Sequence, residues 1–329
     1  MLFRSVFFEE TLANLKKLFR VEPRAVAYDL HPNYMSSRFA LRLPITQKVG
    51  VQHHHAHIAS CMAENHLSGK VIGVAFDGTG YGTDGKIWGG EFLVADFAGF
   101  ERRAHLRYVP LAGGDTAVRQ PWRMALSYLR DAFGPNSLPS GLRFLDSIPE
   151  KQLDLVDAML LRGINSVETS SCGRLFDAVA SLIDLRQDVN FEGQAAIELE
   201  MIAQADLQQR YSFLVSDGEP AQVDMRPMIE NIVQDLARSK PAGYMAACFH
   251  NTVAAAIVEV CRSVRKRDQL KRVCLSGGTF QNMYLLRRAV EGLQRDGFEV
   301  YLHSLVPPND GGISLGQAVI ANEMLRRGN

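Results

Sequence analysis

The sequence predicts an α/β protein with two lobes. Short apolar segments typical of strands lie early in the chain, mostly helical sequence follows, and strand–loop–helix units recur near the end. At 329 residues the chain exceeds the usual length of a single-core domain, and 47% hydrophobic residues suffice for two cores. In such lobes a ligand usually binds beyond the strand ends, in the cleft between the lobes.

We expect three parts along the chain. Residues 1–20 form a helix or a connection from an upstream domain. Residues 21–115 form the first α/β lobe, and the C-terminal helix 313–329 packs back on it. Residues 116–312 form the second lobe, which is helix-rich.

The first lobe begins with short strands. Apolar segments at 25–27 and 49–51 predict strands, and the second leads directly into a helix from 53 to about 66. A buried strand at 71–76 ends in a glycine-rich turn, and a strand resumes at 88–95, so we expect a hairpin.

The later part of the chain is richer in helices. Sequence from 122 to about 207 is mostly helical, and 211–225 is turn-rich and locally strand-like. Beyond it, the pattern predicts helices at 228–236, 244–264, 283–295 and 313–327 and strands at 272–275 and 299–305.

Charge and composition exclude several classes of protein. Lys+Arg and Asp+Glu are both 36, so the chain lacks the basic excess of a DNA-binding protein, and the basic run 262–272 is interpreted as a solvated helix face. No apolar stretch approaches the ~18 residues of a transmembrane helix, so no membrane partner is expected. Five cysteines without a C-x-x-C pair indicate neither disulfides nor a zinc knuckle, and predict a cytoplasmic protein.

Four of the nine histidines lie in the segment VQHHHAH, residues 51–57. If this segment opens a helix, His53 and His57 lie one turn apart on one face, where two imidazoles reach the same metal ion. Two ligands are too few for a protein metal site, so a distant carboxylate should complete it. The alternative is a solvated or structurally satisfied histidine run.

Two glycine-rich segments suit the close approach of a phosphate or nucleoside. Asp77 ends the buried strand and is followed by glycines at 78, 80, 82 and 85, which let backbone amides turn toward a phosphate. Segment 276–282 (SGGTFQN) follows a later strand in the same manner. Ordinary tight turns remain the alternative for both.

Two further carboxylates have open roles. Asp310 lies between Asn309 and two glycines at the start of the last helix, where it is either an N-cap or the missing metal ligand. Asp177 follows the segment 171–176 on a helix, where it either bonds a ribose hydroxyl or is a helix-face carboxylate.

Eight segments together resemble the C-terminal carbamoyltransferase part of the HypF family, which acts in nickel–iron hydrogenase maturation. They are VQHHHAH (51–57), FDGTGYGTDGKIWGGEF (76–92), LAGGDTAVRQPWRMAL (111–126), SSCGRLFDAVASL (170–182), NFEGQAAIELE (190–200), CFHNTVA (248–254), LSGGTFQN (275–282) and PPNDGGISLGQA (307–318). The HxxxH pair and the late Asp also resemble those of the TsaD tRNA threonylcarbamoyltransferases and of the NodU-type antibiotic O-carbamoyltransferases. All three families share the two-lobed actin/Hsp70-like (ASKHA) fold, with nucleotide and metal in the interlobe cleft.

The resemblance implies roles for individual residues. The implied metal ligands are His53, His57, Asp77 and Asp310. The implied phosphate side is Gly78, Thr79, Gly80 and Gly82, and the implied adenosine side is Asp177, Gly193, Gly277, Gly278 and Asn282. Further pocket residues implied to act in catalysis are His54, His55, Arg119, Arg123 and His250.

The resemblance also implies a reaction. Carbamoyl adenylate, made from ATP by a YrdC-like adenylating domain or chain, would donate its carbamoyl group to the C-terminal cysteine thiol of HypE, and AMP would leave. The thiocarboxamide is later dehydrated to the cyanide ligand of the hydrogenase. A divalent metal, zinc or iron, would assist.

The sequence departs from typical HypF proteins, which carry an acylphosphatase domain, zinc-finger-like segments and the YrdC-like domain ahead of this region. We therefore expect either a piece of a longer protein or a stand-alone transferase. Two other functions stay open: a carbamoyl- or threonylcarbamoyltransferase acting on tRNA or a small-molecule hydroxyl, and a nucleotide-binding module without turnover. The clustered histidines argue against the last, because nucleotide binding alone does not need them.

Overall fold

The computed structural model describes residues 2–135 and 137–328. The chain forms two compact units, residues 1–51 and 52–329. The lobe boundary expected near residue 115 stays a prediction; strands from both sides of it share one sheet within the second unit.

The first unit is a small α/β arrangement. Its elements are α1 (Leu2–Phe19), β1 (Ala25–Asp29), α2 (Met35–Arg42) and β2 (Gln47–Val51). The two strands pair in parallel, with Ala25 opposite Gln47. The Ser37 hydroxyl donates to the Asp29 carbonyl oxygen at 2.7 Å and so fixes α2 to the end of β1. Both predicted strands are confirmed.

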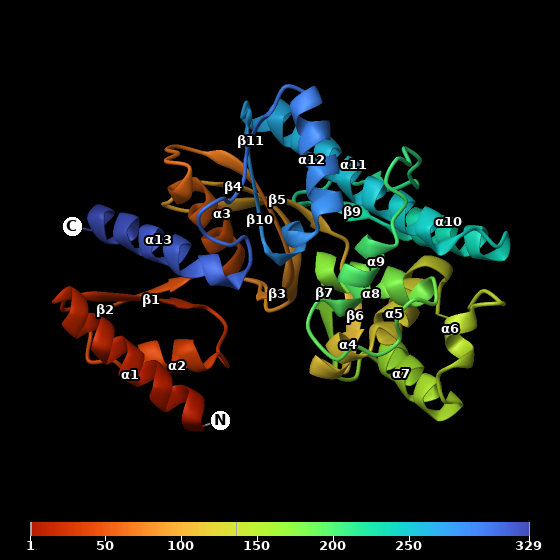
Figure 1. Ribbon diagram of the computed structural model, residues 1–329, viewed down its shortest axis with the longest axis horizontal. Coiled ribbons are helices and arrows are strands. Elements are labelled where there is room, and N and C mark those ends of the chain that lie inside the picture. The colour runs from red at the N-terminus through yellow and green to blue at the C-terminus, as the bar shows by residue number, and fades with distance from the viewer. Residues whose placement is uncertain (1, 136, 329) are drawn as a thin grey trace. The chain divides into compact units, whose positions relative to one another are not determined.

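The second unit is built on a nine-stranded sheet (Figure 1), in which β11–β10–β3–β4–β5–β9–β8 form the main order and β7 joins β4 to β6. Its strands are β3 (Val71–Tyr81), β4 (Ile87–Ala95), β5 (Phe100–Leu106), β6 (Val109–Ala112), β7 (Ser166–Thr169), β8 (Leu214–Val215), β9 (Ala221–Asp224), β10 (Arg272–Ser276) and β11 (Glu299–Tyr301). The central strand β3 pairs in parallel with β10 and antiparallel with β4.

Helices cover both faces of this sheet. They are α3 (His53–Glu64), α4 (Asp115–Arg119), α5 (Pro121–Phe133), α6 (Arg143–Asp146), α7 (Glu150–Arg162), α8 (Cys172–Leu182), α9 (Gln194–Met201), α10 (Arg226–Ala237), α11 (Ala242–Asp268), α12 (Met283–Arg295) and α13 (Ile313–Arg327), with short 3₁₀ turns η1 (Gly278–Gln281) and η2 (Asp310–Gly312). The predicted helices at 283–295 and 313–327 are confirmed to the residue.

Alternation along β3 explains its continuous apolar sequence. Val71 and Ala75 pack with α3 residues such as Ile58, whereas Ile72 and Val74 belong to the large core on the other face. A strand covered on both faces needs apolar residues at every position. The helix α3 therefore lies directly on the central strand.

The end of β3 differs from the prediction. The strand was expected to stop at Phe76, but it continues to Tyr81 through the glycine-rich segment, with a register shift between Phe76 and Gly80. The turn of the hairpin lies at residues 82–86, where the amide of Gly82 donates to the carbonyl of Lys86 at 2.9 Å. The irregularity places Asp77 at a bend in the middle of the sheet.

Three strands were not predicted, namely β5, β6 and β7. The sequence of β5, FERRAHL, carries three charged residues, and β7, SVET, is short and polar. Both form because their backbones pair with strands already in the sheet, β4 and β6 respectively.

The helix α3 lies between the sheet and α13 (Figure 1). The contact with α13 is close, because a methyl group at Gly316 would lie 1.9 Å from the carbonyl oxygen of Ala56. The Ser60 hydroxyl also donates to the carbonyl of Gly312 at 2.8 Å. These contacts join the start of the unit to its last helix.

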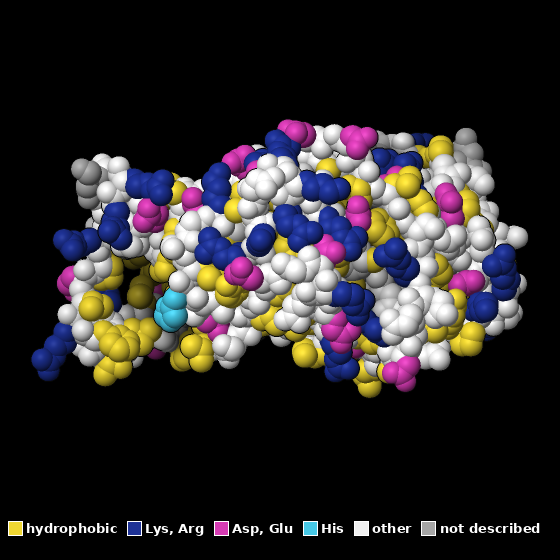
Figure 2. Space-filling model, turned by 90° about the horizontal axis from the view of Figure 1, so that it is seen from above, with side chains coloured by type: hydrophobic (Ala, Val, Ile, Leu, Met, Phe, Trp, Pro, Cys, Tyr) yellow, Lys and Arg dark blue, Asp and Glu magenta, His cyan; other side chains and the backbone are white. Residues whose placement is uncertain are grey.

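Among the described residues, α11 is the one helix with the length and composition to cross a membrane, and 83% of its apolar window is buried inside the protein, as in a core helix. Its basic end is ion-paired: Arg262 and Arg265 bond Asp296, and Arg267 bonds Glu219. On the face shown in Figure 2, Lys and Arg side chains are scattered with acidic side chains between them.

Candidate functional site

The histidine segment forms the first turns of α3. The helix begins at His53 because the side chain of Gln52 caps it, accepting from the His55 amide at 2.8 Å. His53 and His57 then lie on one face with ring centroids 5.0 Å apart, and both are about 1% exposed.

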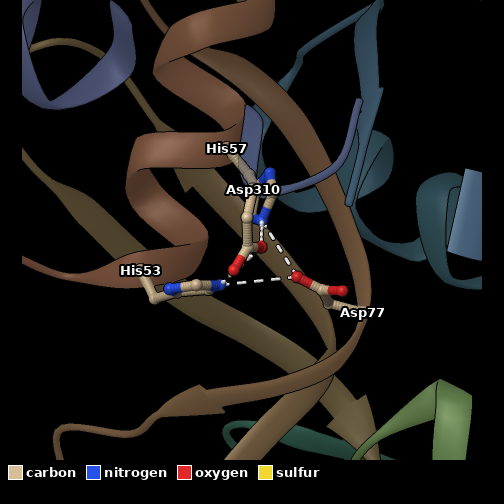
Figure 3. Close-up of side chains that lie close together, drawn as sticks. All are labelled: His53, His57, Asp77 and Asp310. Carbon is tan, nitrogen blue, oxygen red and sulfur yellow. Dashed lines mark hydrogen bonds and ion pairs between the residues drawn. The ribbon is translucent and has the colours of Figure 1, made fainter. Parts of the chain in front are cut away.

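Two carboxylates converge on these imidazoles (Figure 3). Asp77 Oδ2 lies 2.9 Å from His57 Nε2 and 3.4 Å from His53 Nε2. Asp310 Oδ1 lies 3.6 Å from His53 Nε2 and 3.7 Å from His57 Nε2. Residues 53, 77 and 310 come from α3, β3 and η2, so three separate elements meet at one point.

These four side chains fit a divalent metal. One ligand atom from each lies within 4.8 Å of all the others. Ligands about 2.0–2.1 Å from a tetrahedral zinc lie roughly 3.4 Å from one another, close to the separations of 2.9–3.7 Å given above. Imidazole and carboxylate donors suit zinc and iron alike. The side chain of Asp310 is 68% exposed, so the cluster is accessible to solvent from the side on which Asp310 lies.

The electrostatics show how tightly the four groups interact. Burial alone would raise the pKa of Asp77, but hydrogen bonds from His53 and His57 hold it well below its usual value. Burial alone would lower the pKa of His57, but Asp310 and Asp77 raise it. Asp77 is fixed from its other oxygen as well, because Oδ1 accepts from the amides of Gly78 at 2.7 Å and Gly278 at 3.3 Å.

A cavity of about 600 Å³ adjoins this cluster, and Asp77 and Asp310 form part of its wall. It contains two buried polar atoms with no hydrogen-bond partner among the described residues, Arg174 Nε and Asp177 Oδ2. Arg174 Nη2 lies 2.9 Å from Asp177 Oδ2, but the pair is not aligned as a hydrogen bond. Burial raises the pKa of Asp177 to about 6, and Arg174 opposes the rise. Unsatisfied groups of this kind suit a polar ligand.

The residues implied to bind nucleotide divide into two groups. Those that line the cavity are Gly78, Asp177, Gly193, Gly278 and Asn282. Those that are not part of its lining are Thr79, Gly80, Gly82 and Gly277.

The three glycines outside the cavity wall lie in close packing contacts, and their predicted role at the nucleotide stays a prediction. A methyl group at Gly80 would lie 2.4 Å from His54 Cε1, so this glycine makes room for the imidazoles. A methyl group at Gly82 would lie 2.2 Å from Trp88 Nε1. Gly277 has a φ of +105° and lies against the backbone of Phe76, an arrangement that favours glycine.

The five implied catalytic residues are not part of the cavity lining either. His54 is fully buried beside His53, and burial holds its pKa well below the usual value. His55 contacts the Asp96 carbonyl at 2.6 Å. Arg119 is exposed at the end of α4, and Arg123 donates to Gln120 Oε1 at 2.7 Å.

His250 has an indirect connection to the cavity. Burial lowers its pKa to about 4, so it is neutral near pH 7. Its Nδ1 lies 2.7 Å from the carbonyl of Ala246, and its Nε2 lies 2.9 Å from Asn282 Nδ2. The natural tautomer therefore donates from Nδ1 and accepts from Asn282, which fixes that side chain.

The sequence analysis missed four residues near the cluster: Arg174, Ser276, His303 and Glu64. Arg174 and Ser276 belong to the segments 171–176 and 276–282, but nothing in the sequence marks their own side chains as part of the site. Ser276 lies 3.4 Å from His57 Nδ1 and 2.8 Å from His303 Nε2. A larger cavity of about 860 Å³ between β8, α11 and α12 contains none of the predicted site residues.

Comparison with known proteins identifies the relatives of this chain. The family described as "Carbamoyltransferase, Kae1-like Domain, second subdomain" matches residues 73–317, and "HypF Kae1-like domain" matches residues 4–64. The carbamoyltransferase HypF of Synechocystis sp. is 38% identical over 331 residues, which cover 94% of this chain and 42% of that protein. A carbamoyltransferase HypF homolog of Cupriavidus necator is 39% identical over 308 residues, covering 91% of this chain and 77% of that protein.

The fold agrees with these matches. Full-length HypF, solved in a phosphate- and nucleotide-bound form, superimposes with a TM-score of 0.92 at 46% identity, covering 97% of this chain and 41% of that one. The chain thus spans about two-fifths of the length of several proteins that it matches. The predicted resemblance is confirmed, and so is the α/β fold class, because the chain has the fold of the solved HypF structures.

Proposed function

This chain belongs to the HypF carbamoyltransferase family, and we propose that it transfers the carbamoyl group of carbamoyl adenylate to the C-terminal cysteine thiol of HypE. The product serves the biosynthesis of the cyanide ligands of nickel–iron hydrogenase. The carbamoyl adenylate comes from a YrdC-like adenylating domain or chain. The observation that carries the proposal is the cluster of His53, His57, Asp77 and Asp310 at the wall of a 600 Å³ cavity.

The reaction is an acyl transfer. The thiolate of the partner attacks the carbamoyl carbon, a carbon–sulfur bond forms, and the bond from carbon to the phosphate oxygen breaks, so that its electron pair leaves with AMP. His53, His57, Asp77 and Asp310 would hold a zinc or iron ion. When bound, such an ion polarises an acyl group and neutralises charge on a departing phosphate.

The cavity offers complementary groups for the nucleotide. Arg174 supplies a buried cation whose Nε has no partner among the described residues, and a phosphate oxygen suits this donor. Asp177 Oδ2 is a buried acceptor, and a ribose hydroxyl suits it. Asn282, fixed by His250, lines the same cavity as Gly193 and Gly278.

The cysteines support a cytoplasmic setting for the reaction. All five are unpaired and buried, and burial raises the pKa of Cys172 and Cys261 above the usual value of a thiol. Buried neutral thiols of this kind suit the reducing cytoplasm, where we place the reaction.

The test compares the wild type with His53→Ala/His57→Ala. We expect the double variant to lose bound metal, measured by elemental analysis, and to lose transfer of labelled carbamoyl from supplied carbamoyl adenylate to HypE, measured by mass spectrometry of its C-terminal peptide. Each ~1.4 kcal/mol of lost transition-state stabilisation lowers the rate tenfold. His66→Asn is the control, because His66 is an exposed histidine beyond the end of α3.

Full transfer by the metal-free double variant would reject the proposal. Wild-type protein that transfers carbamoyl to tRNA or a small-molecule hydroxyl, but not to HypE, would instead favour the TsaD- or NodU-type activity. Nucleotide binding without transfer to any acceptor would favour a binding module.

A further inference from the structure

A chain of hydrogen bonds runs from the metal cluster to a carboxylate at the other end of α3. His57 Nδ1 lies 3.4 Å from Ser276 Oγ, Ser276 Oγ lies 2.8 Å from His303 Nε2, and His303 Nδ1 lies 3.0 Å from Glu64 Oε2. Ser276 is fully buried, and the side chains of His303 and Glu64 are 3% exposed. None of the three side chains is part of the cavity lining.

The chemistry of these groups fixes the direction of the chain. An ionised carboxylate only accepts, so His303 donates to Glu64 from Nδ1 and presents Nε2 as an acceptor. The Ser276 hydroxyl then donates to His303, and its oxygen accepts from His57 Nδ1. Since Nδ1 is engaged by Ser276, Nε2, which faces Asp77 and Asp310, is the nitrogen of His57 through which a metal would bind.

Glu64 also contacts the loop that carries Asp310, the ligand on the exposed side of the cluster. Its Oε1 accepts from the Ser304 amide at 2.5 Å, from the Ser304 hydroxyl at 2.9 Å and from the Leu305 amide. These residues begin the loop that ends at Asp310. One carboxylate thus orients a histidine of the cluster and anchors the loop that carries its exposed ligand.

A serine hydrogen-bonded to a histidine and a glutamate also resembles the triad of a serine hydrolase. Here the serine is inaccessible, because Ser276 is 0% exposed and its hydroxyl lies between two imidazoles. No substrate carbonyl reaches it. The arrangement instead matches the way metal-bound histidines are held, through a hydrogen bond from the ring nitrogen that does not bind the metal.

We propose that Ser276, His303 and Glu64 are positioning residues of the metal centre, which fix the ring and tautomer of His57 and the approach of Asp310. The proposal rests on the metal site of the proposed function. It does not depend on which acceptor receives the carbamoyl group.

The experiment measures metal binding by the whole chain. Zn²⁺ affinity is determined by competition with a chelator, and the visible spectrum of the Co²⁺ form reports ligand geometry. We expect Ser276→Ala and Glu64→Gln each to weaken Zn²⁺ binding about 10- to 100-fold and to change the Co²⁺ spectrum. Tyr211→Phe is the matched control, because it removes a buried hydrogen bond, 3.0 Å to Asp235, in another part of the same unit.

Combining the two variants tests whether the residues act as one chain. We expect the Ser276→Ala/Glu64→Gln double variant to bind Zn²⁺ about as weakly as the weaker single variant, since either change interrupts the same connection. Wild-type affinity and spectrum in both single variants would overturn the proposal. If the wild type and His57→Ala bind Zn²⁺ equally weakly, the metal site itself is wrong, and the positioning role falls with it.

Discussion

The buried carboxyl of Asp177 makes the stability of the protein depend on pH. Burial raises its pKa from the usual 3.8 to about 6. The folded protein therefore binds this proton more tightly than the unfolded chain, so the stabilisation is complete below about pH 4 and is lost as the pH rises to about 6. At about 1.4 kcal/mol for each tenfold change in acidity, the loss amounts to about 3 kcal/mol.

The variant Asp177→Asn removes this titration. We measure the free energy of unfolding with urea between pH 4 and pH 7.5. As the pH rises, that of the wild type should fall by up to about 3 kcal/mol relative to that of Asp177→Asn. Its absolute stability is also lowered, because Arg174 loses its ion partner, so the comparison uses the change with pH alone. Asp184→Asn, at an exposed carboxylate beyond α8, controls for the loss of a charge. Parallel pH profiles for wild type and Asp177→Asn would refute the reasoning.

Two further predictions concern close contacts, and a third concerns the pH dependence of stability. Gly80→Ala places a methyl group 2.4 Å from His54 Cε1. It should lower the free energy of unfolding, measured by thermal denaturation, by about 1–3 kcal/mol. Gly316→Ala should lower the free energy of unfolding, measured by urea titration, by at least as much, because the added methyl group forces α13 away from α3. Gly99→Ala is the control, because no atom lies within 4 Å of its added methyl group, and it should leave this free energy unchanged. Burial would raise the pKa of Glu64, but hydrogen bonds to its carboxylate lower that pKa to about 2. The free energy of unfolding of the wild type should therefore fall relative to that of Glu64→Gln as the pH decreases from about 4.5 to 2. Parallel curves of unfolding free energy against pH for the two proteins would contradict this.

The helices and apolar strands of the fold were largely predictable from local sequence. The helix 283–295 begins at the side-chain cap of Asn282, and the helix 313–327 begins after a proline- and glycine-rich loop, so both boundaries are marked in the sequence. The strand β5 lacks such signals, because four of its seven residues are polar and its pairing depends on the neighbouring strand β4, which its own sequence does not reveal. The strand at 299–305 is shorter than predicted, because the backbone amides of Ser304 and Leu305 donate to the Glu64 carboxylate instead of pairing in the sheet.

The candidate site was predictable in part for the same reason. The spacing of His53 and His57 is a property of one helix, and the sequence contains it. The connection of Glu64 to His303 joins residues far apart in the chain, and neither belongs to a recognisable motif. The glycines at 80 and 82 follow a phosphate-loop pattern, yet their neighbours are aromatic and imidazole rings, which only the folded hairpin brings together.

The tight packing of α13 against α3 has a consequence for the order in which the metal cluster assembles during protein synthesis. The histidines are made some 250 residues before Asp310 and the helix that packs on α3. A contact of such long range forms late in folding. An ion that needs all four side chains would therefore be captured only after Asp310 has been made, and a nascent chain halted before Asp310 should be unable to retain it.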